Sequence, residues 1–127
     1  MQKITLKDLK EKKACTEGLE YFEKMYGEEC AIAEFIKTKH KIDYVIWLIM
    51  GCEYCQTPEF IKYLKTLNPT SDDVCWLISK CDYCQTPEFI KYLKTLNPTS
   101  DYVCWLISKC DYCQTPEIKE MLMEGLK

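Results

Sequence analysis

Cysteine is the residue type in this chain best able to do chemistry, and six of the ten cysteines form three CxxC pairs. Each pair has two residues between its cysteines, and the pairs are Cys52/Cys55, Cys81/Cys84 and Cys110/Cys113. Two CxxC pairs about 25 residues apart are able in principle to bind one zinc ion through four thiolates. For that alternative the ligands would be Cys81, Cys84, Cys110 and Cys113.

Three observations count against a zinc site. Three pairs do not divide into sites of four sulfurs, and the first cysteine of each pair continues the apolar stripe of a helix. Equivalent residues of stacked helices lie about 10 Å apart, whereas zinc-bound sulfurs all lie about 2.3 Å from the metal. Cys75 and Cys104 align with Ile46 of an earlier copy, which indicates packing. We therefore prefer buried reduced thiols, with no metal and no cofactor, and leave zinc ligands and disulfides open.

The cysteine pairs belong to a repeated segment. Residues 55–83 recur as residues 84–112 with one change, because Tyr102 stands where the first copy has Asp73. A diverged older copy, residues 43–55, precedes them. A fixed period of 29 residues is typical of stacked helical repeats.

Each copy reads as two short helices joined by a turn. Thr57 is a helix N-cap, and Pro58 fits the first helical position, where its missing N–H has no cost. Asn68-Pro69 ends this helix, and Thr70 or Ser71 caps the next one. The buried stripe of that second helix follows a spacing of three or four residues and consists of Val74, Leu77, Ile78 and Cys81.

The whole chain is predicted to be all-α: a short α-solenoid of 29-residue helix–turn–helix repeats with an N-terminal helical cap. Outside the two central copies we expect helices over residues 4–13, 17–26, 31–39 and 43–50, a solvated turn at residues 37–41, and no strand. We expect one domain, residues 1–127, composed of a helical module (1–41), the repeats (42–112) and a C-terminal capping helix (113–127).

Charge and hydropathy restrict the partners. The chain has 17 basic residues, all lysine, and 20 acidic ones, for a formal net charge of −3. Without arginine there is no bidentate guanidinium contact to guanine or phosphate, which argues against nucleic acid. The N-terminus lacks the apolar core of a signal peptide, and the longest apolar run, residues 44–50, is shorter than the about 20 residues that span a bilayer. We expect a cytoplasmic protein without membrane association.

The tryptophans and lysines of the repeats are the candidates for binding a partner. On a helical wheel Trp76 lies about 200° from Val74, away from the buried stripe. A row of such tryptophans would be a hot-spot surface for another protein, although we prefer packing between repeats. The candidate partner-binding residues are Trp76, Trp105, Lys62, Lys65, Lys91, Lys94, Asp73 and Tyr102.

No residue pattern indicates catalysis. His40 is the only histidine, nothing in the sequence arranges a triad around it, and the four glycines are not clustered. A second copy of a catalytic centre along the chain brings no advantage. Extra repeats that bind an extended partner do, because each repeat adds contacts and so increases the affinity. We therefore predict a protein that is not an enzyme.

The N-terminal part of the chain carries a series of short packing motifs. They are Ile4-Thr5-Leu6, Leu9-Lys10, Ala14-Cys15, Gly18-Leu19, Phe22, Tyr26-Gly27, Asp43-Tyr44 and Trp47-Leu48. Residues 4–48 thereby resemble small N-terminal helical modules in proteins of phages, prophages and plasmids. The resemblance implies an origin in a mobile genetic element, where small stable binders often block host defence enzymes. It carries over no catalytic residue, and the doubled cysteine-rich repeat departs from that module.

Together these observations predict a non-catalytic helical-repeat module that binds a protein. Its size, acidity and repeat form, together with what the resemblance implies, lead us to expect an anti-CRISPR-like inhibitor of a host defence protein, such as a CRISPR effector nuclease complex, acting in the cytoplasm of the host cell. The alternative is a zinc-stabilised structural repeat protein. An exposed tryptophan row would favour self-association as readily as recruitment of another protein.

Overall fold

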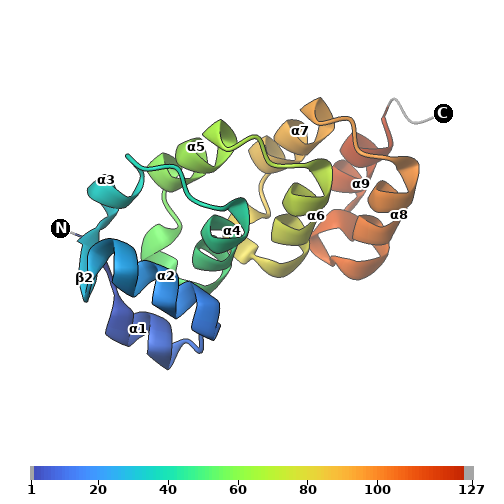
Figure 1. The fold of residues 1–127 in the computed structure, drawn as a ribbon. Coiled ribbons are helices and arrows are strands. Elements are labelled where there is room, and N and C mark those ends of the chain that lie inside the picture. Colours follow the sequence, from blue (N-terminus) through green and yellow to red (C-terminus); the bar gives the residue numbers. More distant parts are fainter. Residues whose placement is uncertain (1, 125–127) are drawn as a thin grey trace. The chain divides into compact units, whose positions relative to one another are not determined.

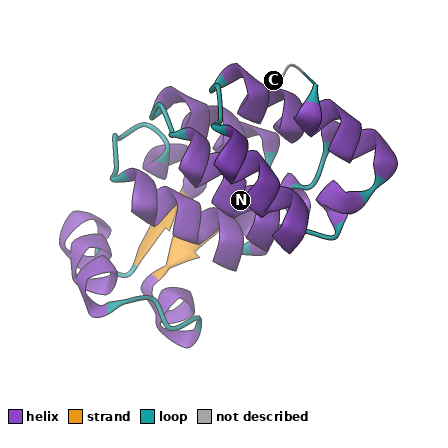
Figure 2. Ribbon diagram, turned by 90° about the vertical axis from the view of Figure 1, so that its right-hand side faces the viewer, coloured by secondary structure: helices purple, strands orange, loops and turns teal. Residues whose placement is uncertain are grey.

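The computed structural model describes residues 2–124, and over this range the protein is all-α apart from one two-stranded sheet (Figures 1 and 2). The described elements are β1 (Lys3–Thr5), α1 (Leu6–Glu11), α2 (Thr16–Tyr26), β2 (Glu29–Ala31), α3 (Ile32–Phe35), α4 (Ile42–Gly51), η1 (Glu53–Cys55), α5 (Pro58–Thr66), α6 (Ser71–Lys80), η2 (Asp82–Cys84), α7 (Pro87–Thr95), α8 (Ser100–Lys109), η3 (Tyr112–Gln114) and α9 (Pro116–Met123), where η marks a 3₁₀ turn. The all-α prediction is confirmed, whereas the predicted absence of strands is wrong.

The elements group into two compact units, residues 1–67 and residues 68–127. The boundary lies in the Asn68-Pro69 turn, inside the first of the two nearly identical copies. Helix α5 therefore belongs to the N-terminal unit and α6 to the C-terminal unit, although one copy of the repeat contains both.

In the N-terminal unit, β1 and β2 pair antiparallel. The register places Lys3 opposite Ala31, Ile4 opposite Cys30 and Thr5 opposite Glu29. Ile4 and Cys30 face the core, at 0% and 6% exposure, because alternate strand residues point to opposite sides. Thr5 then accepts the backbone N–H of Asp8 at 3.1 Å and acts as the N-cap, so that α1 begins only at Leu6.

Two predicted helices are shorter in the structure, because residues at their ends belong to this sheet or lie outside any helix. The helix expected over residues 4–13 is shortened to Leu6–Glu11, and the one expected over residues 31–39 is shortened to Ile32–Phe35. A strand of three residues is stabilised by a partner far away in the sequence, and such a partner leaves no trace in the local apolar period.

His40 is buried at 4% exposure, so its predicted place in a solvated turn is wrong. Its Nε2–H donates to the carbonyl oxygen of Phe35 at 3.0 Å, which leaves Nδ1 to accept the Tyr21 hydroxyl at 2.6 Å. The ring also stacks on Phe35, with centroids 4.0 Å apart. The His40 backbone N–H donates to the Tyr63 hydroxyl at 3.1 Å, and that hydroxyl donates to the Thr38 carbonyl at 2.6 Å. Burial lowers the pKa of His40, which keeps the ring neutral.

In the C-terminal unit, α6 packs beside α8 and α7 packs beside α9 (Figure 1). Tyr102, in the first turn of α8, donates its hydroxyl to Asp72 in the first turn of α6 at 2.7 Å. At the other end, the thiol of Cys110 donates to the Ile78 carbonyl at 3.7 Å. Because the start of α8 contacts the start of α6 and the end of α8 contacts the end of α6, the two helices run parallel. The predicted stripe of Val74, Leu77, Ile78 and Cys81 is buried, as expected.

Local sequence signals set the ends of the repeat helices. Thr57 and Thr86 each accept the backbone N–H three residues further on, at 3.2 Å, with proline at the first helical position. Asn68 and Asn97 follow α5 and α7 with φ of 56° and 53°, a left-handed conformation that asparagine adopts more readily than most residues. The caps and helix ends predicted from Thr57, Pro58 and Asn68 are confirmed.

Candidate functional site

The three cysteine pairs lie at the same place in each copy, at the C-terminal end of a helix. The first cysteine follows the last helical residue, and the second lies in the turn beyond it. In each turn the backbone N–H of the second cysteine donates to the carbonyl of the first, at 2.9 Å or 3.0 Å. All six side chains are buried.

In all three pairs the two thiols contact each other. This contact, followed by burial, raises the pKa of Cys55 and of Cys84, whereas for Cys113 burial is the first cause and the contact with Cys110 the second. The same contact lowers the pKa of their partners, Cys52 and Cys81, because one thiol donates its proton to the sulfur of the other. The geometry is that of packed thiols which satisfy each other.

The cysteines of different pairs are the candidates for a shared metal site. Within residues 2–124, no group of three or more His, Cys, Asp or Glu side chains is placed to hold a metal ion. In the C-terminal unit, Cys110 instead accepts the side-chain N–H of Gln85 at 3.7 Å and donates to a helix carbonyl. The proposed zinc ligands Cys81, Cys84, Cys110 and Cys113 therefore form two separate pairs, and the geometry gives the zinc alternative no support.

A glutamine directly after each pair has a role that the sequence analysis does not assign. Its side-chain amide donates to a carbonyl in the last turn of the preceding helix, where backbone carbonyls lack helical partners. The contacts are Gln56 with Ile49 (2.9 Å), Gln85 with Ile78 (3.0 Å) and Gln114 with Ile107 (3.1 Å). The available signal was the recurrence of glutamine after every CxxC pair.

Aromatic side chains gather on the outer side of α6 and α8. Trp76 is 45% exposed and Tyr102 is 39% exposed, while Trp105 is half-buried. The Nζ atom of Lys80 lies 5.3 Å from the centroid of the Trp76 ring, within range of a cation–π contact. The preferred interpretation of the tryptophans as packing residues is therefore wrong for Trp76. Trp76, Lys80, Tyr102 and Trp105 are named the aromatic face below.

The single difference between the two copies lies on this face. Tyr102 donates its hydroxyl to the Asp72 carboxylate and so joins α8 to α6, a contact that raises the pKa of Tyr102. Asp73, its counterpart in the first copy, accepts the Thr70 backbone N–H at 3.0 Å and completes a capping box at the start of α6. The substitution thus replaces a local cap by a contact between copies.

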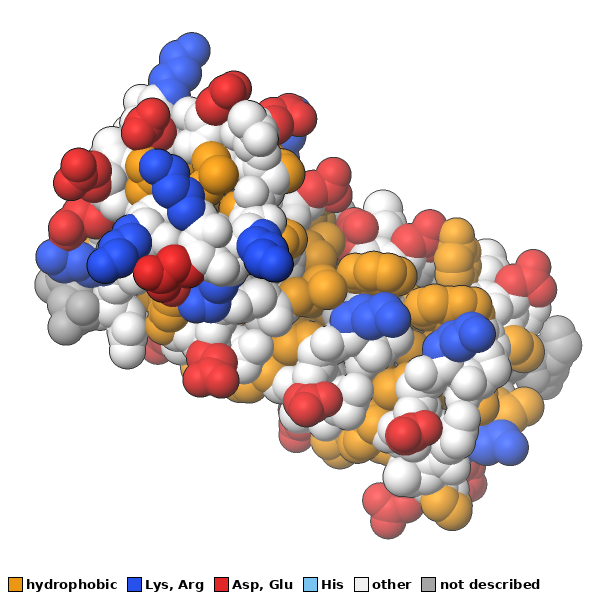
Figure 3. All heavy atoms as spheres, turned by 90° about the horizontal axis from the view of Figure 1, so that it is seen from below, with side chains coloured by type: hydrophobic (Ala, Val, Ile, Leu, Met, Phe, Trp, Pro, Cys, Tyr) orange, Lys and Arg blue, Asp and Glu red, His pale blue; other side chains and the backbone are white. Residues whose placement is uncertain are grey.

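The charged side chains of α6 and α8 are separated by sign, with the acidic ones at the start of each helix and the basic ones at its end. Asp72, Asp73 and Asp101 lie in the first turns of α6 and α8, and Lys80 and Lys109 lie in the last turns. Because the two helices run parallel, the carboxylates lie at one edge of the face and the ammonium groups at the other. Seen from below, the C-terminal unit shows apolar side chains interleaved with lysines and carboxylates (Figure 3).

The predicted lysines lie on other helices than the residues of the aromatic face. Lys62 and Lys65 are exposed on α5, in the N-terminal unit. Lys91 is exposed on α7, which belongs to the other row of helices in the C-terminal unit. Lys94, also on α7, donates to the backbone carbonyl of Glu124 at 2.7 Å. Of the predicted partner-binding residues, the structure therefore places Trp76, Tyr102 and Trp105 on the neighbouring helices α6 and α8, with Asp73 in the first turn of α6.

Comparisons with known proteins add no assignment. The sequence matches no protein-family model, and neither a curated protein nor a solved structure gives a significant match. In the described part of the chain, no helix has the length and apolar character needed to cross a membrane.

Proposed function

We propose that this chain is a non-catalytic protein-binding module whose contact surface is the aromatic face. The observation that carries the proposal is Trp76, a large ring that is 45% exposed on a helix whose opposite side is fully packed. Tryptophan and tyrosine are the residues whose burial at an interface most often dominates binding energy. The parallel packing of α6 and α8 holds Trp76 and Trp105 at a fixed spacing, which reduces the entropy lost on binding.

The charges around the aromatic face define the chemistry of the partner. Carboxylates at one edge and lysines at the other favour a protein surface with an apolar centre, basic groups toward Asp72 and Asp101, and acidic groups toward Lys80 and Lys109. The formal net charge of −3 adds a weak preference for a basic partner.

A variant pair tests this surface. Trp76→Ser removes the exposed ring, and Lys91→Ser changes an exposed residue on the other row of helices. We expect wild type and Lys91→Ser to recover the same protein from a host lysate, with affinity reduced about 30-fold or more in Trp76→Ser, the loss typical of a hot spot. Equal recovery by Trp76→Ser, with unchanged thermal unfolding in all three proteins, would reject the aromatic face as the contact surface.

A second copy of the chain is the competing occupant of this face. Sedimentation velocity of wild type and Trp76→Ser separates the two cases. A monomer in both samples supports recruitment of another protein. A dimer that is lost in Trp76→Ser would show that the face serves self-association, and the recruitment proposal would fail.

The resemblance of residues 4–48 to modules of mobile genetic elements supports a class of target, a host defence protein such as a CRISPR effector complex. Plasmid interference in cells with an active effector tests this target. Expression of the wild-type chain should restore transformation by the targeted plasmid, and Trp76→Ser should not. Undiminished interference with the wild-type chain would exclude this effector as the target.

A further inference from the structure

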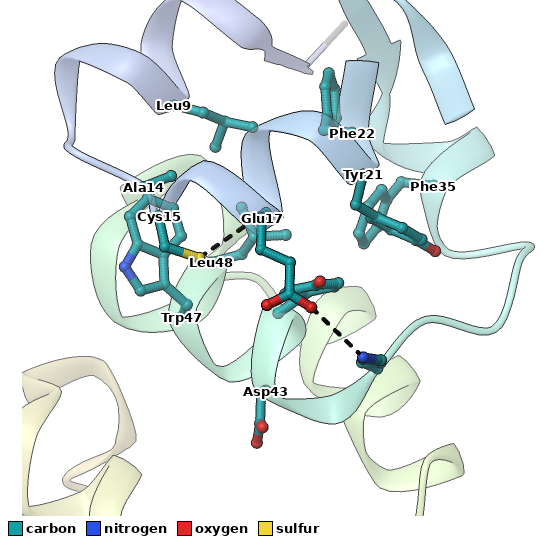
Figure 4. A pocket seen from close by; sticks show the side chains of 13 residues that line it. Leu9, Ala14, Cys15, Glu17, Tyr21, Phe22, Phe35, Asp43, Trp47 and Leu48 are labelled. Atoms are coloured by element: carbon teal, nitrogen blue, oxygen red, sulfur yellow. Dashed lines mark hydrogen bonds and ion pairs between the residues drawn. The ribbon is translucent and has the colours of Figure 1, made fainter. Parts of the chain in front are cut away.

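The N-terminal unit contains a pocket of about 410 Å³ between α2 and α4 (Figure 4). Its walls are mainly apolar and aromatic, and include Leu9, Tyr21, Phe22, Tyr44, Trp47 and Leu48. The volume lies in the range of about 300–1,000 Å³ that small-molecule sites occupy. None of these residues belongs to the aromatic face, so the pocket is a separate candidate site.

The mouth of the pocket already contains an ammonium group. Lys41 Nζ lies 3.9 Å from Glu17 Oε1 and 5.9 Å from the centroid of the Tyr44 ring. Burial, followed by the charge of Glu17, raises the pKa of Tyr44, so the carboxylate and the ring lie close together. The side chains of Glu17 and Lys41 are 77% and 71% exposed, so their long ion pair contributes little and is readily displaced. Asp43 points away from the mouth in Figure 4, which leaves Glu17 as the carboxylate that faces an incoming cation.

We propose that this pocket binds a small organic cation, namely a quaternary ammonium group attached to an apolar chain. The ammonium group takes the position of Lys41 between Glu17 and the Tyr44 ring, where aromatic faces attract cations that carry no N–H. The apolar chain lies against Leu9, Phe22 and Leu48 and leaves water for an apolar surface. Lys41 thereby acts as an internal competitor for the same place.

Two exposed cysteines allow binding to be measured with an internal control. Cys15 lines the pocket, whereas Cys104 lies on α8 in the other unit. The rate at which iodoacetamide alkylates each cysteine is followed by peptide mass spectrometry, with hexyltrimethylammonium, 1-hexanol or hexyl sulfate present. We expect hexyltrimethylammonium to protect Cys15 and not Cys104, at a concentration about two- to fivefold lower than 1-hexanol requires, the factor expected of an exposed cation–π contact. Hexyl sulfate should protect least.

Substitutions at the mouth separate the ammonium group from the apolar chain. Glu17→Gln should weaken protection by hexyltrimethylammonium, with Glu20→Gln on the same helix as the control. Lys41→Gln should strengthen it, because the competing ammonium is gone, with Lys39→Gln as the control. All four residues are exposed, so folding is retained and is checked by circular dichroism. Equal protection by 1-hexanol, or no gain in affinity in Lys41→Gln, would overturn the proposal.

Discussion

Helices α5 and α7 have the same sequence, PEFIKYLKT, but lie in different units and make different contacts. In α5, Phe60 is completely buried and lies 6.0 Å from the Phe35 ring and 6.0 Å from the Tyr63 ring, centroid to centroid. In α7, Phe89 is 6% exposed and lies 6.2 Å from the Tyr92 ring. The repeated sequence thus specifies a helix, and the neighbouring elements determine how deeply its side chains are buried and which rings they contact.

The same contrast holds for the polar groups of the two units. The N-terminal unit contains a unique cluster in which His40, Phe35 and Tyr63 contact one another, with no counterpart elsewhere in the sequence because His40 is the only histidine. The glutamine after each cysteine pair, in contrast, makes the same contact in both units. We infer that the N-terminal unit depends on individual side chains in addition to the contacts that recur with the period.

The largest expected difference between the units is at the paired phenylalanines. Phe60→Ala should lower the free energy of unfolding by about 3–5 kcal/mol. Phe89→Ala should cost about 1 kcal/mol less, because this residue makes one aromatic pair fewer. Urea unfolding of both variants measures the difference, and an equal or larger loss in Phe89→Ala would contradict the contrast between the two helices.

Tyr63 offers a second matched pair. Tyr63→Phe removes the hydroxyl that accepts the His40 N–H and donates to Thr38, so we expect a loss of about 1–3 kcal/mol in the free energy of unfolding. Tyr92→Phe, at the equivalent position of α7, changes a ring that is half-buried rather than buried and should cost less. If both substitutions cost the same, the polar cluster around His40 does not distinguish the units.

His40 makes the N-terminal unit sensitive to acid. Its pKa in the folded protein is lowered below the ordinary value of 6.5, so the unfolded chain binds the proton more readily. Stability contributed by the neutral ring is therefore fully present above pH 6.5 and is lost as the pH falls from there through the lower folded pKa. Urea midpoints between pH 7.5 and pH 5 should fall more steeply for wild type than for His40→Asn. Parallel curves would mean that burial of His40 does not resist protonation.

The one position that differs between the copies gives the smallest expected effect. Asp73→Ala removes one half of the capping box of α6 and should cost about 0.3–1 kcal/mol, as expected for a carboxylate near a helix N-terminus. Tyr102→Ala leaves the Thr99 cap of α8 in place and removes the contact with Asp72 instead.

Tyr102→Asp makes the two copies identical and should create a capping box at the start of α8. Amide hydrogen exchange should then show increased protection of the first turn of α8. Unchanged protection would indicate that the box depends on more than this residue.

Much of the fold could be predicted where the information is local. Thr57 and Pro58 start a helix, Asn68 ends it, and the spacing of Val74 and Leu77 defines a buried stripe, since each signal acts within a few residues. The strand at residues 3–5 could not be predicted in this way, because its hydrogen-bond partner lies beyond α2.

The candidate site was predictable only in part, for the same reason. The helical wheel placed Trp76 away from the buried stripe, but whether a neighbour covers that side depends on packing between elements. The burial of His40 and the pocket at Glu17 and Lys41 also require contacts between distant segments. The lysines Lys62 and Lys91 share a sequence position, yet they lie in different units, which the period alone does not reveal.

The most direct test of the aromatic face is site-specific photo-crosslinking. A benzophenone amino acid replaces either Lys109, at the edge of the aromatic face, or Lys91, on the other row of helices. We predict that position 109 crosslinks one host protein, that Trp76→Ser abolishes this crosslink, and that position 91 does not form it. A crosslink from position 91 with equal or greater yield, or one from position 109 that persists in Trp76→Ser, would contradict the account.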